Sequence, residues 1–362
     1  MEWPAGVYRL ARSPFFRRGF VFGKCLLVFL LALGVENNQI RHTLMLVEER
    51  VQLPKYFDGT IEHPFVHRML TPQLSRLLLE LTPPSVADRI ETLMRPAQDW
   101  LLRPGLTDLE RPLAYYWVFV VQLLSFVGYA WLVERITRRC APHSRLAHFA
   151  APLALVALFP IIEGHYGHLY DPTSLLTMAA LVDAITAHRH GWYLIVFVLA
   201  CCTKETAVFA SVGYACYFLD RLPPAKFVRM IVYQAGIFSA VYVGALVLYA
   251  ENPGGRMFFA LPEQLGWLSQ RTITEAVCFL VLMLVYFARF PDKPPALQRL
   301  TAIPAVNALF FLAMANPGEW RNFYESLPVL IPLAILNLEA AIGPGPRPSH
   351  DGPETPLSPS GN

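Results

Sequence analysis

Long apolar segments separated by short polar connections restrict the fold of this chain more than any other feature. A transmembrane helix needs about 20 apolar residues, although shorter helices are tolerated inside a bundle. Backbone polar groups within lipid must be satisfied internally, so such segments fold as helices. The sequence therefore predicts an all-α fold, a polytopic integral membrane helix bundle with about ten transmembrane spans, near 19–35, 113–134, 147–162, 173–187, 191–202, 206–219, 227–249, 272–288, 300–314 and 326–343.

The composition agrees with a membrane protein. Of the 362 residues, 54% are hydrophobic and only 16% are charged, and the mean hydropathy of +0.38 exceeds what a soluble domain needs to fill a core. The six cysteines have neither metal-type nor secreted-disulfide spacing, so we interpret them as apolar packing residues. The first apolar segment lacks a small-residue cleavage site, and we expect it to be retained as a span.

The apolar run from Trp192 to Leu219 is interrupted by Lys204 and Glu205. A charge inside lipid costs about 2.5 to 3.5 kcal/mol on insertion scales. The run is either one span with two inward polar residues or two short helices with a hinge. A single span would move the basic segment "DRLPPAKFVRM" to the outer side, against the positive-inside rule. We therefore predict two helices, 191–202 and 206–219, that meet at Thr203–Thr206 on the outer side.

This topology places both termini in the cytoplasm. Most lysines and arginines then fall in inner loops, and the short outer loops carry only Lys204, Arg256, Arg271 and Arg321. We divide the chain into a basic cytoplasmic N-terminus (1–18), a transmembrane bundle (19–343) and a Pro-rich, disordered cytoplasmic tail (344–362).

The long outer segment 36–112 carries apolar residues at helical spacing, with charges on the opposite face. Pro83, Pro84 and Pro96 interrupt this pattern. The segment predicts two amphipathic helices that lie in the membrane interface.

Polar residues collect in five outer segments: "KYFDGTIEHPFVHRMLTP", "EGHYGHLYDPTS", "TKET", "ENPGGRMFF" and "NPGEWRNFYES". Helix capping explains part of this pattern. Asn316 and Thr272 begin capping boxes, and Thr203 is placed to cap the helix after it. For Asp171, before Pro172, and for Glu205, capping and a role in a site both remain open. Membrane proteins bury such groups where they line a cavity, so the five segments predict a polar site.

Several expected spans begin on the outer side, where helix N-termini favour a bound phosphate. Basic residues in the outer segments would complete this anion site; for each, anchoring at lipid headgroups is the alternative. These residues are Arg68, Lys204, Arg256 and Arg321.

Acidic, histidine and tyrosine residues would line the pocket: Glu62, Glu163, His165, His168, Tyr170, Asp171, Glu205, Glu319 and Glu325. Those between Glu163 and Asp171 are also of the types that bind a divalent cation, but their spacing matches no established metal motif. We expect no cofactor and keep a divalent cation as the alternative. As general base we favour Asp58, which lies between aromatic residues and a turn-forming glycine, over the adjacent Glu48 and Glu49, which are typical of a solvated face.

The arrangement resembles the polytopic glycosyltransferases of the C superfamily, which take sugars from polyprenyl-phosphate carriers. The resemblance covers 19–343 and rests on the long acidic first outer loop and on "HLYDPTSLLTMAALV", "CCTKETAVF" and "EWRNFYESLPVLIPLA". In that superfamily an acidic residue of the first outer loop acts as the base, which here maps to Asp58, or else to Glu48 or Glu49. The chain departs from the pattern because it lacks an adjacent acidic pair directly after the first span and a sizeable extramembrane domain.

The resemblance implies a membrane glycosyltransferase of the bacterial inner membrane. It would move a sugar from a polyprenyl-phosphate-linked donor to a lipid or glycan acceptor at the outer face. Its partners would be the lipid-linked sugar and membrane lipids, with no nucleic acid. Two alternatives remain: a transporter or flippase for a lipid-linked or anionic solute, and a non-catalytic component of an envelope-polysaccharide system.

Overall fold

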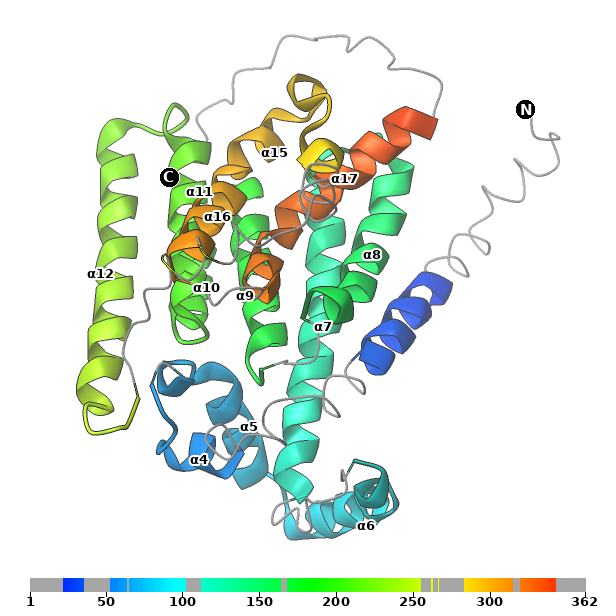
Figure 1. Ribbon diagram of the computed structural model, residues 1–362, viewed down its shortest axis with the longest axis vertical. Helices are drawn as coiled ribbons and strands as arrows, with labels where there is room; N and C mark the ends of the chain where they lie inside the picture. Colours follow the sequence, from blue (N-terminus) through cyan, green and yellow to red (C-terminus); the bar gives the residue numbers. More distant parts are fainter. Residues whose placement is uncertain are drawn as a thin grey trace, which may run out of the picture.

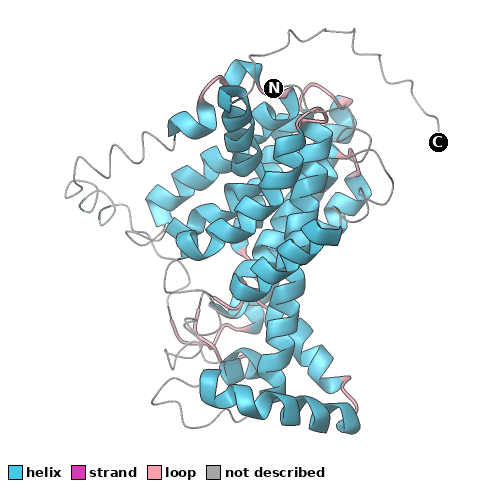
Figure 2. Cartoon of the chain, turned by 90° about the vertical axis from the view of Figure 1, so that its right-hand side faces the viewer, coloured by secondary structure: helices cyan, strands magenta, loops and turns pink. Residues whose placement is uncertain are grey.

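The computed structural model describes residues 22–35, 53–63, 65–101, 112–163, 168–254, 262, 266, 283–314 and 320–342. Within these residues the protein is helical and contains no β-strand (Figures 1 and 2). The predicted all-α class is therefore confirmed for the part of the chain that is described.

The first helix covers Phe22–Val35. The labelled elements follow in chain order: α4 (Leu53–Asp58), η2 (Phe65–His67), α5 (Leu70–Glu80), α6 (Pro84–Leu101), α7 (Pro112–Cys140), α8 (Arg145–Glu163), α9 (Asp171–Thr186), α10 (His190–Cys201), η3 (Glu205–Ala207), α11 (Val208–Phe218), α12 (Pro224–Leu248), η4 (Phe290–Asp292), α15 (Pro295–Leu300), α16 (Ala302–Met314), η5 (Trp320–Ser326) and α17 (Leu327–Ile342).

Helix α9 forms the centre of the bundle. Nearly all of its side chains are buried, including those of Asp171, Ser174 and Asp183. It packs against α7 on one side and α10 on the other, and it also contacts α11, α17 and η5. One apolar core joins α9 to α10, α11 and α15, and a second joins it to α7, α8 and α17.

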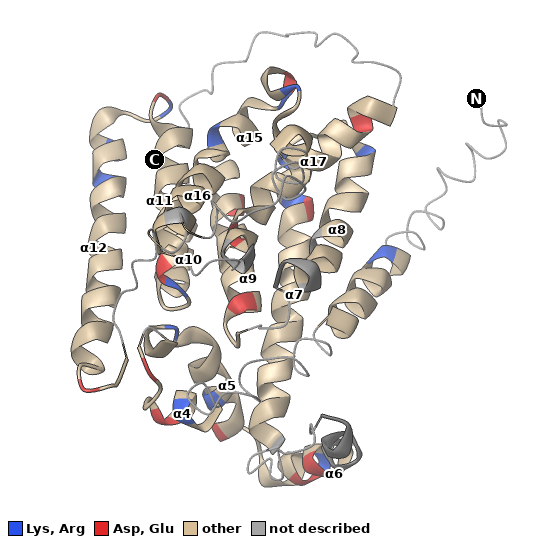
Figure 3. Cartoon of the chain, in the orientation of Figure 1, with Lys and Arg blue, Asp and Glu red and all other residues tan. Residues whose placement is uncertain are grey.

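Among the described residues, three helices are long and apolar enough to cross a membrane: Leu113–Cys140, Pro224–Leu248 and Phe323–Ile342. Charged residues lie mainly at the helix ends and in the connections, and the middle of α12 carries none (Figure 3). The other predicted spans within the described residues are helical, but several are short; α10 has 12 residues and α11 has 11. The predicted span 272–288 lies mostly outside the described residues.

The predicted break in the apolar run is confirmed. Helix α10 ends at Cys201, Lys204 has extended backbone angles, and α11 begins at Val208 after one turn of 3-10 helix. Two separate helices therefore replace a single long one.

The two predicted amphipathic helices correspond to α5 and α6, which lie at one end of the bundle (Figure 1). One detail of the prediction is wrong: α5 and α6 are separated just before Pro84, the first residue of α6, but α6 continues through Pro96. A proline inside a helix removes one backbone hydrogen bond, and the turns on either side of Pro96 retain theirs.

Candidate functional site

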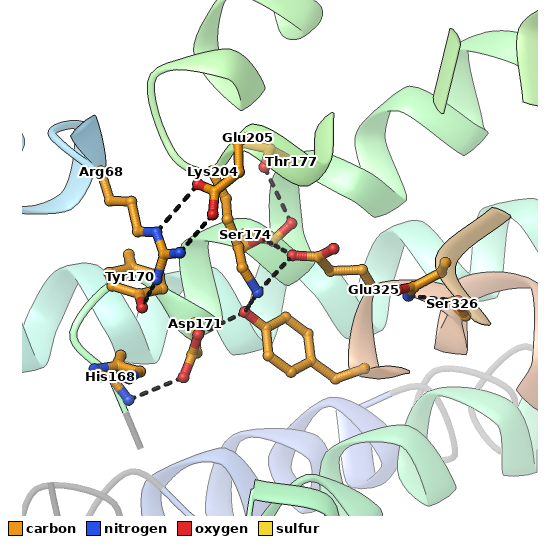
Figure 4. Close-up of polar contacts among 12 residues, drawn as sticks. Arg68, His168, Tyr170, Asp171, Ser174, Thr177, Lys204, Glu205, Glu325 and Ser326 are labelled. Atoms are coloured by element: carbon orange, nitrogen blue, oxygen red, sulfur yellow. Dashed lines mark hydrogen bonds and ion pairs between the residues drawn. The ribbon is translucent and has the colours of Figure 1, made fainter. Parts of the chain in front are cut away.

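Four segments that are distant in the sequence meet at the end of the bundle beside α5. They are the residue after η2, the start of α9, the connection between α10 and α11, and the end of η5. Their polar side chains form one network, drawn in Figure 4. We call this set the polar network: Arg68, His168, Tyr170, Asp171, Ser174, Lys204, Glu205, Tyr324 and Glu325.

The connection between α10 and α11 sends its two charged side chains to different partners. The Thr203 hydroxyl donates a hydrogen bond to the Leu199 carbonyl, one turn earlier in α10. Thr203 therefore does not cap the next helix, and the prediction that it would is wrong. Lys204 is extended, with φ −162° and ψ 145°. The Leu70 N–H donates to the Cys202 carbonyl at 3.0 Å, which ties this connection to α5.

Arg68 binds Glu205 through a fork of two hydrogen bonds. The Arg68 Nη2 lies 2.5 Å from Glu205 Oε1, and the Arg68 Nε lies 3.2 Å from Oε2. The guanidinium also donates to the Tyr170 hydroxyl and lies 4.5 Å from the centre of that ring, a cation–π contact. Burial alone would raise the pKa of Glu205, but the charge of Arg68 and its hydrogen bonds, with Lys204, lower it to about 2.

Lys204 lies in the interior and forms an ion pair with Glu325. Its Nζ lies 3.0 Å from Glu325 Oε1 and also donates to the Tyr324 hydroxyl at 3.0 Å. The side chain of Lys204 is 6% exposed and that of Glu325 is fully buried. The Ser174 hydroxyl donates to the same carboxylate oxygen at 3.0 Å. The other oxygen, Oε2, has no hydrogen-bond partner among the described residues.

Asp171 is the first residue of α9 and not its N-cap, which corrects the capping prediction by one position. Its Oδ1 accepts a hydrogen bond from the Tyr324 hydroxyl at 2.5 Å. Its Oδ2 accepts from the backbone N–H of His168 at 2.9 Å. The His168 ring stacks on Tyr170 with centroids 5.1 Å apart. Asp171 therefore connects η5 to the turn before α9, and capping alone does not explain it.

The polar network contains two basic and three acidic side chains. Arg68 and Lys204 pair with carboxylates in this structure, and their role as phosphate ligands stays a prediction. Lys204 and Glu205, although adjacent in the sequence, pair with different residues and not with each other. The arrangement provides buried carboxylates, a lysine and tyrosine hydroxyls within hydrogen-bonding distance, which are groups suited to proton transfer.

The low pKa of Glu205 predicts a pH dependence of stability. A carboxyl group whose pKa falls from 4.5 to about 2 on folding stabilises the protein fully above pH 4.5, and this contribution disappears as the pH falls towards 2. At neutral pH we expect Glu205→Gln to lower stability by about 1.5 to 3 kcal/mol, typical of hydrogen bonds to charged groups. Thermal unfolding of both proteins in a non-ionic detergent should show this difference shrinking between pH 4.5 and 2. A difference independent of pH would contradict the ion pair.

Asp58 lies apart from this arrangement. It is the exposed last residue of α4, and none of the described contacts joins it to the polar network. Glu62 lies in the loop that follows, beside Gly254. Glu163 and Arg321 lie in α8 and η5, but their side chains are not described. Arg256, His165 and Glu319 lie outside the described residues.

Two members of the polar network, Ser174 and Tyr324, were missed by the sequence analysis. Ser174 lies three residues after Asp171, so helical spacing places both on one face of α9. Tyr324 precedes Glu325 directly. Within the described residues, no group of three or more histidine, cysteine, aspartate or glutamate side chains is arranged to hold a metal ion.

A second group of charges lies near the other end of α9, where the buried Asp183 meets two partly exposed arginines. The Asp183 carboxylate pairs with Arg139 at 2.8 Å and with Arg135 at 3.3 Å. Arg139 also donates to the Thr186 hydroxyl. The polar residues of α9 are therefore not confined to the end that carries the polar network.

Comparisons of this chain with protein-family models, with curated proteins and with solved structures find no match.

Proposed function

We propose that this protein is a membrane glycosyltransferase that moves a sugar from a polyprenyl-phosphate carrier to a lipid or glycan acceptor. The observation that carries the proposal is the polar network, in which buried acidic, basic and hydroxyl groups converge from four segments at the end of a helical bundle. Burying so many charges is expensive, so their concentration in an apolar protein favours a functional site. The resemblance to glycosyltransferases of the C superfamily supports the same reaction.

In this proposal the donor phosphate competes with Glu325 for Lys204. The Glu325 carboxylate, once released, accepts the proton of an acceptor hydroxyl. The acceptor oxygen then forms a bond to the anomeric carbon, and the bond from that carbon to the phosphate oxygen breaks with its electron pair. Lys204 and Arg68 stabilise the negative charge of the departing phosphate, and the sugar inverts its configuration.

Asp58 is the other candidate for the base, because the resemblance assigns that role to the first outer loop. Its exposed position favours contact with an acceptor that arrives from the aqueous side. A divalent cation bound together with the donor phosphate is compatible with either base.

The membrane arrangement belongs to the same proposal. It places about ten spans in the bacterial inner membrane, with both termini in the cytoplasm. Helices α5 and α6 then lie in the outer interface, and the polar network faces the outer leaflet. Three long apolar helices support membrane insertion, and the distribution of lysine and arginine supports the orientation.

A transfer assay tests the reaction. Purified protein in liposomes is supplied with a panel of polyprenyl-phosphate-linked pentoses and hexoses, and the release of free polyprenyl phosphate is measured in the presence of membrane lipid extract. We expect Glu325→Gln to reduce the rate by about 10² to 10⁴, the usual effect of losing a general base. Glu251→Gln, at an exposed position, is the matched control.

Asp58→Asn, measured in parallel, distinguishes the two candidates for the base. A large loss in Asp58→Asn with a small loss in Glu325→Gln would assign the base to Asp58. Wild-type protein that releases no polyprenyl phosphate from any donor would refute the proposed reaction.

A transporter or flippase is the second candidate. It is favoured by the ion pairs of Asp183 with Arg135 and Arg139, because polar groups at both ends of α9 are expected along a transport path. If the protein in liposomes moves a lipid-linked sugar between leaflets without cleaving the bond between sugar and phosphate, this result would support the transporter and exclude the sugar transfer.

A further inference from the structure

Basic residues gather at the end of the bundle opposite to the polar network. They lie where α9 ends, where α10 begins and around the connection from α11 to α12 (Figures 1 and 3). We call this set the basic corner: His188, His190, Arg221 and Lys226. Burial and the charge of Arg221 lower the pKa of His188, and burial, Lys226 and His188 lower the pKa of His190. The four side chains are therefore close enough for their charges to act on one another.

Aromatic side chains of α11 support the basic corner. The Phe218 ring contacts both histidine rings, with distances of 5.4 and 4.9 Å between centroids. The Tyr214 hydroxyl lies 2.8 Å from the His190 Nδ1. The Arg221 guanidinium lies 4.7 Å from the centre of the Tyr217 ring, which is a cation–π contact. The basic groups are therefore held against the end of α11.

The positive charge of the basic corner is not balanced by a described acidic residue. Arg221 and Lys226 form no ion pair with another described side chain. Asp220 precedes Arg221, but its carboxylate accepts two hydrogen bonds from the Arg299 guanidinium, one of them 2.6 Å long. Helices α10 and α12 also begin here without an acidic residue in their first turns, so their N-terminal N–H groups add to the positive potential. The basic corner therefore attracts an anion.

An exposed apolar surface starts next to the basic corner. Helices α10 and α12 pack against each other, and Trp192, Val228 and Val232 near their beginnings are each more than half exposed. Helix α12 is long and apolar enough to cross a membrane, and tryptophan is enriched at the level of the lipid head groups. A lipid at this place puts its acyl chains on the apolar surface and its head group at the basic corner. A soluble anion would use the basic corner alone.

We propose that the basic corner binds the phosphate group of an anionic phospholipid whose acyl chains lie along α10 and α12. Arginine and lysine bind phosphate oxygens through charge-assisted hydrogen bonds, and basic groups between transmembrane helices suit such head groups. A zwitterionic phospholipid carries a cation beside its phosphate, and the basic corner repels that cation. The site therefore selects anionic over zwitterionic lipids. In the proposed membrane arrangement, this lipid belongs to the inner leaflet.

Two probes with the same photoreactive acyl chain test the site, one a phosphatidylglycerol and the other a phosphatidylcholine. Each is added to the full-length protein in phosphatidylcholine liposomes, which are irradiated and analysed by peptide mass spectrometry. We expect the phosphatidylglycerol to label peptides from the beginnings of α10 and α12 at about tenfold lower concentrations, a preference of about 1.4 kcal/mol. Equal labelling of these peptides by the two probes would overturn the proposal.

Unlabelled competitors identify the source of the phosphate group. Unlabelled phosphatidylglycerol should displace the photoreactive probe, whereas inorganic phosphate at the same concentration should not, because it gains nothing from the apolar surface. Inorganic phosphate that displaces the probe as well as the lipid does would assign the basic corner to a soluble phosphate compound. That result would overturn the lipid site.

A matched pair of double variants locates the binding. Arg221→Gln/Lys226→Gln removes two charges from the basic corner, whereas Arg89→Gln/Arg145→Gln removes two charges from exposed positions elsewhere. We expect the affinity for phosphatidylglycerol to fall about 30-fold in the first variant, since each basic residue near an anionic surface contributes about fivefold. The control should keep the affinity of the wild type. Lys226→Gln and Arg145→Gln repeat the comparison if the first double variant does not fold, and equal affinities within both pairs would overturn the proposal.

The basic corner and the polar network lie at opposite ends of the bundle, so this experiment and the transfer assay fail separately. Protein that binds phosphatidylglycerol but releases no polyprenyl phosphate would refute the proposed function and retain the lipid site. Protein that transfers sugar but labels equally with both probes would refute the lipid site alone.

Discussion

Replacing Lys204 by methionine is expected to lower the stability of the protein by about 3 to 5 kcal/mol, the usual effect of breaking a buried ion pair. The Glu325 carboxylate is fully buried and forms an ion pair with the Lys204 ammonium group. The Lys204 Nζ also donates to Tyr324, which in turn donates to Asp171. Loss of the lysine therefore leaves two carboxylates with weaker compensation. Denaturation of purified protein in mixed detergent micelles measures the change.

Two comparisons control this experiment. The double variant Lys204→Met/Glu325→Gln removes both charges and should recover part of the loss, because the two residues are coupled. Arg76→Met breaks the exposed pair with Glu80 on α5 and a hydrogen bond to the Phe57 carbonyl, and should change stability by only about 1 kcal/mol. A Lys204→Met effect as small as that of Arg76→Met would show that the buried pair is not formed.

Replacing Gly254 by alanine is expected to lower stability by about 1 to 3 kcal/mol, the usual cost of an unfavourable backbone conformation. Gly254 has φ +97°, and a Cβ there would lie 2.7 Å from the His63 carbonyl oxygen. The turn around it holds the loop before η2, because the His63 N–H donates to the Pro253 carbonyl at 2.8 Å. Asn252 donates to the Gly59 and Ile61 carbonyls in the same loop.

Gly244→Ala is the matched control for this change. Gly244 lies within α12, and a Cβ there would meet no atom within 4 Å. Alanine favours a helix by about 0.5 to 1 kcal/mol over glycine, so this variant should be as stable as the wild type or slightly more stable. Equal stability of the two variants would mean that the turn tolerates a side chain.

Much of the architecture could be predicted from local patterns. The apolar run containing Lys204 and Glu205 indicated a break, and the structure ends α10 and starts α11 on either side of it. The helical spacing within the segment 36–112 predicted two amphipathic helices, which correspond to α5 and α6. The exception was Pro96, because the effect of one proline depends on whether the neighbouring turns hold the helix together.

The charged members of the polar network could be predicted from the sequence, but their pairing could not. Arg68, Lys204, Asp171, Glu205 and Glu325 were all expected near one another, since each lies in a polar segment between apolar helices. From the sequence, Arg68 and Lys204 were expected to bind a phosphate, whereas the structure pairs them with Glu205 and Glu325. Asp58 has the sequence context expected of a general base, but in the structure it lies at the exposed end of α4.

The sequence by itself determined that this chain is helical and apolar, that the run after Trp192 breaks at Lys204, and which polar residues are available. These properties depend on composition and on spacing over a few turns of helix. Only the tertiary structure decided that Arg68 binds Glu205 and that Lys204 binds Glu325. Those contacts join residues more than 100 positions apart, and their geometry depends on how the ends of α9, α10 and η5 meet when the bundle packs.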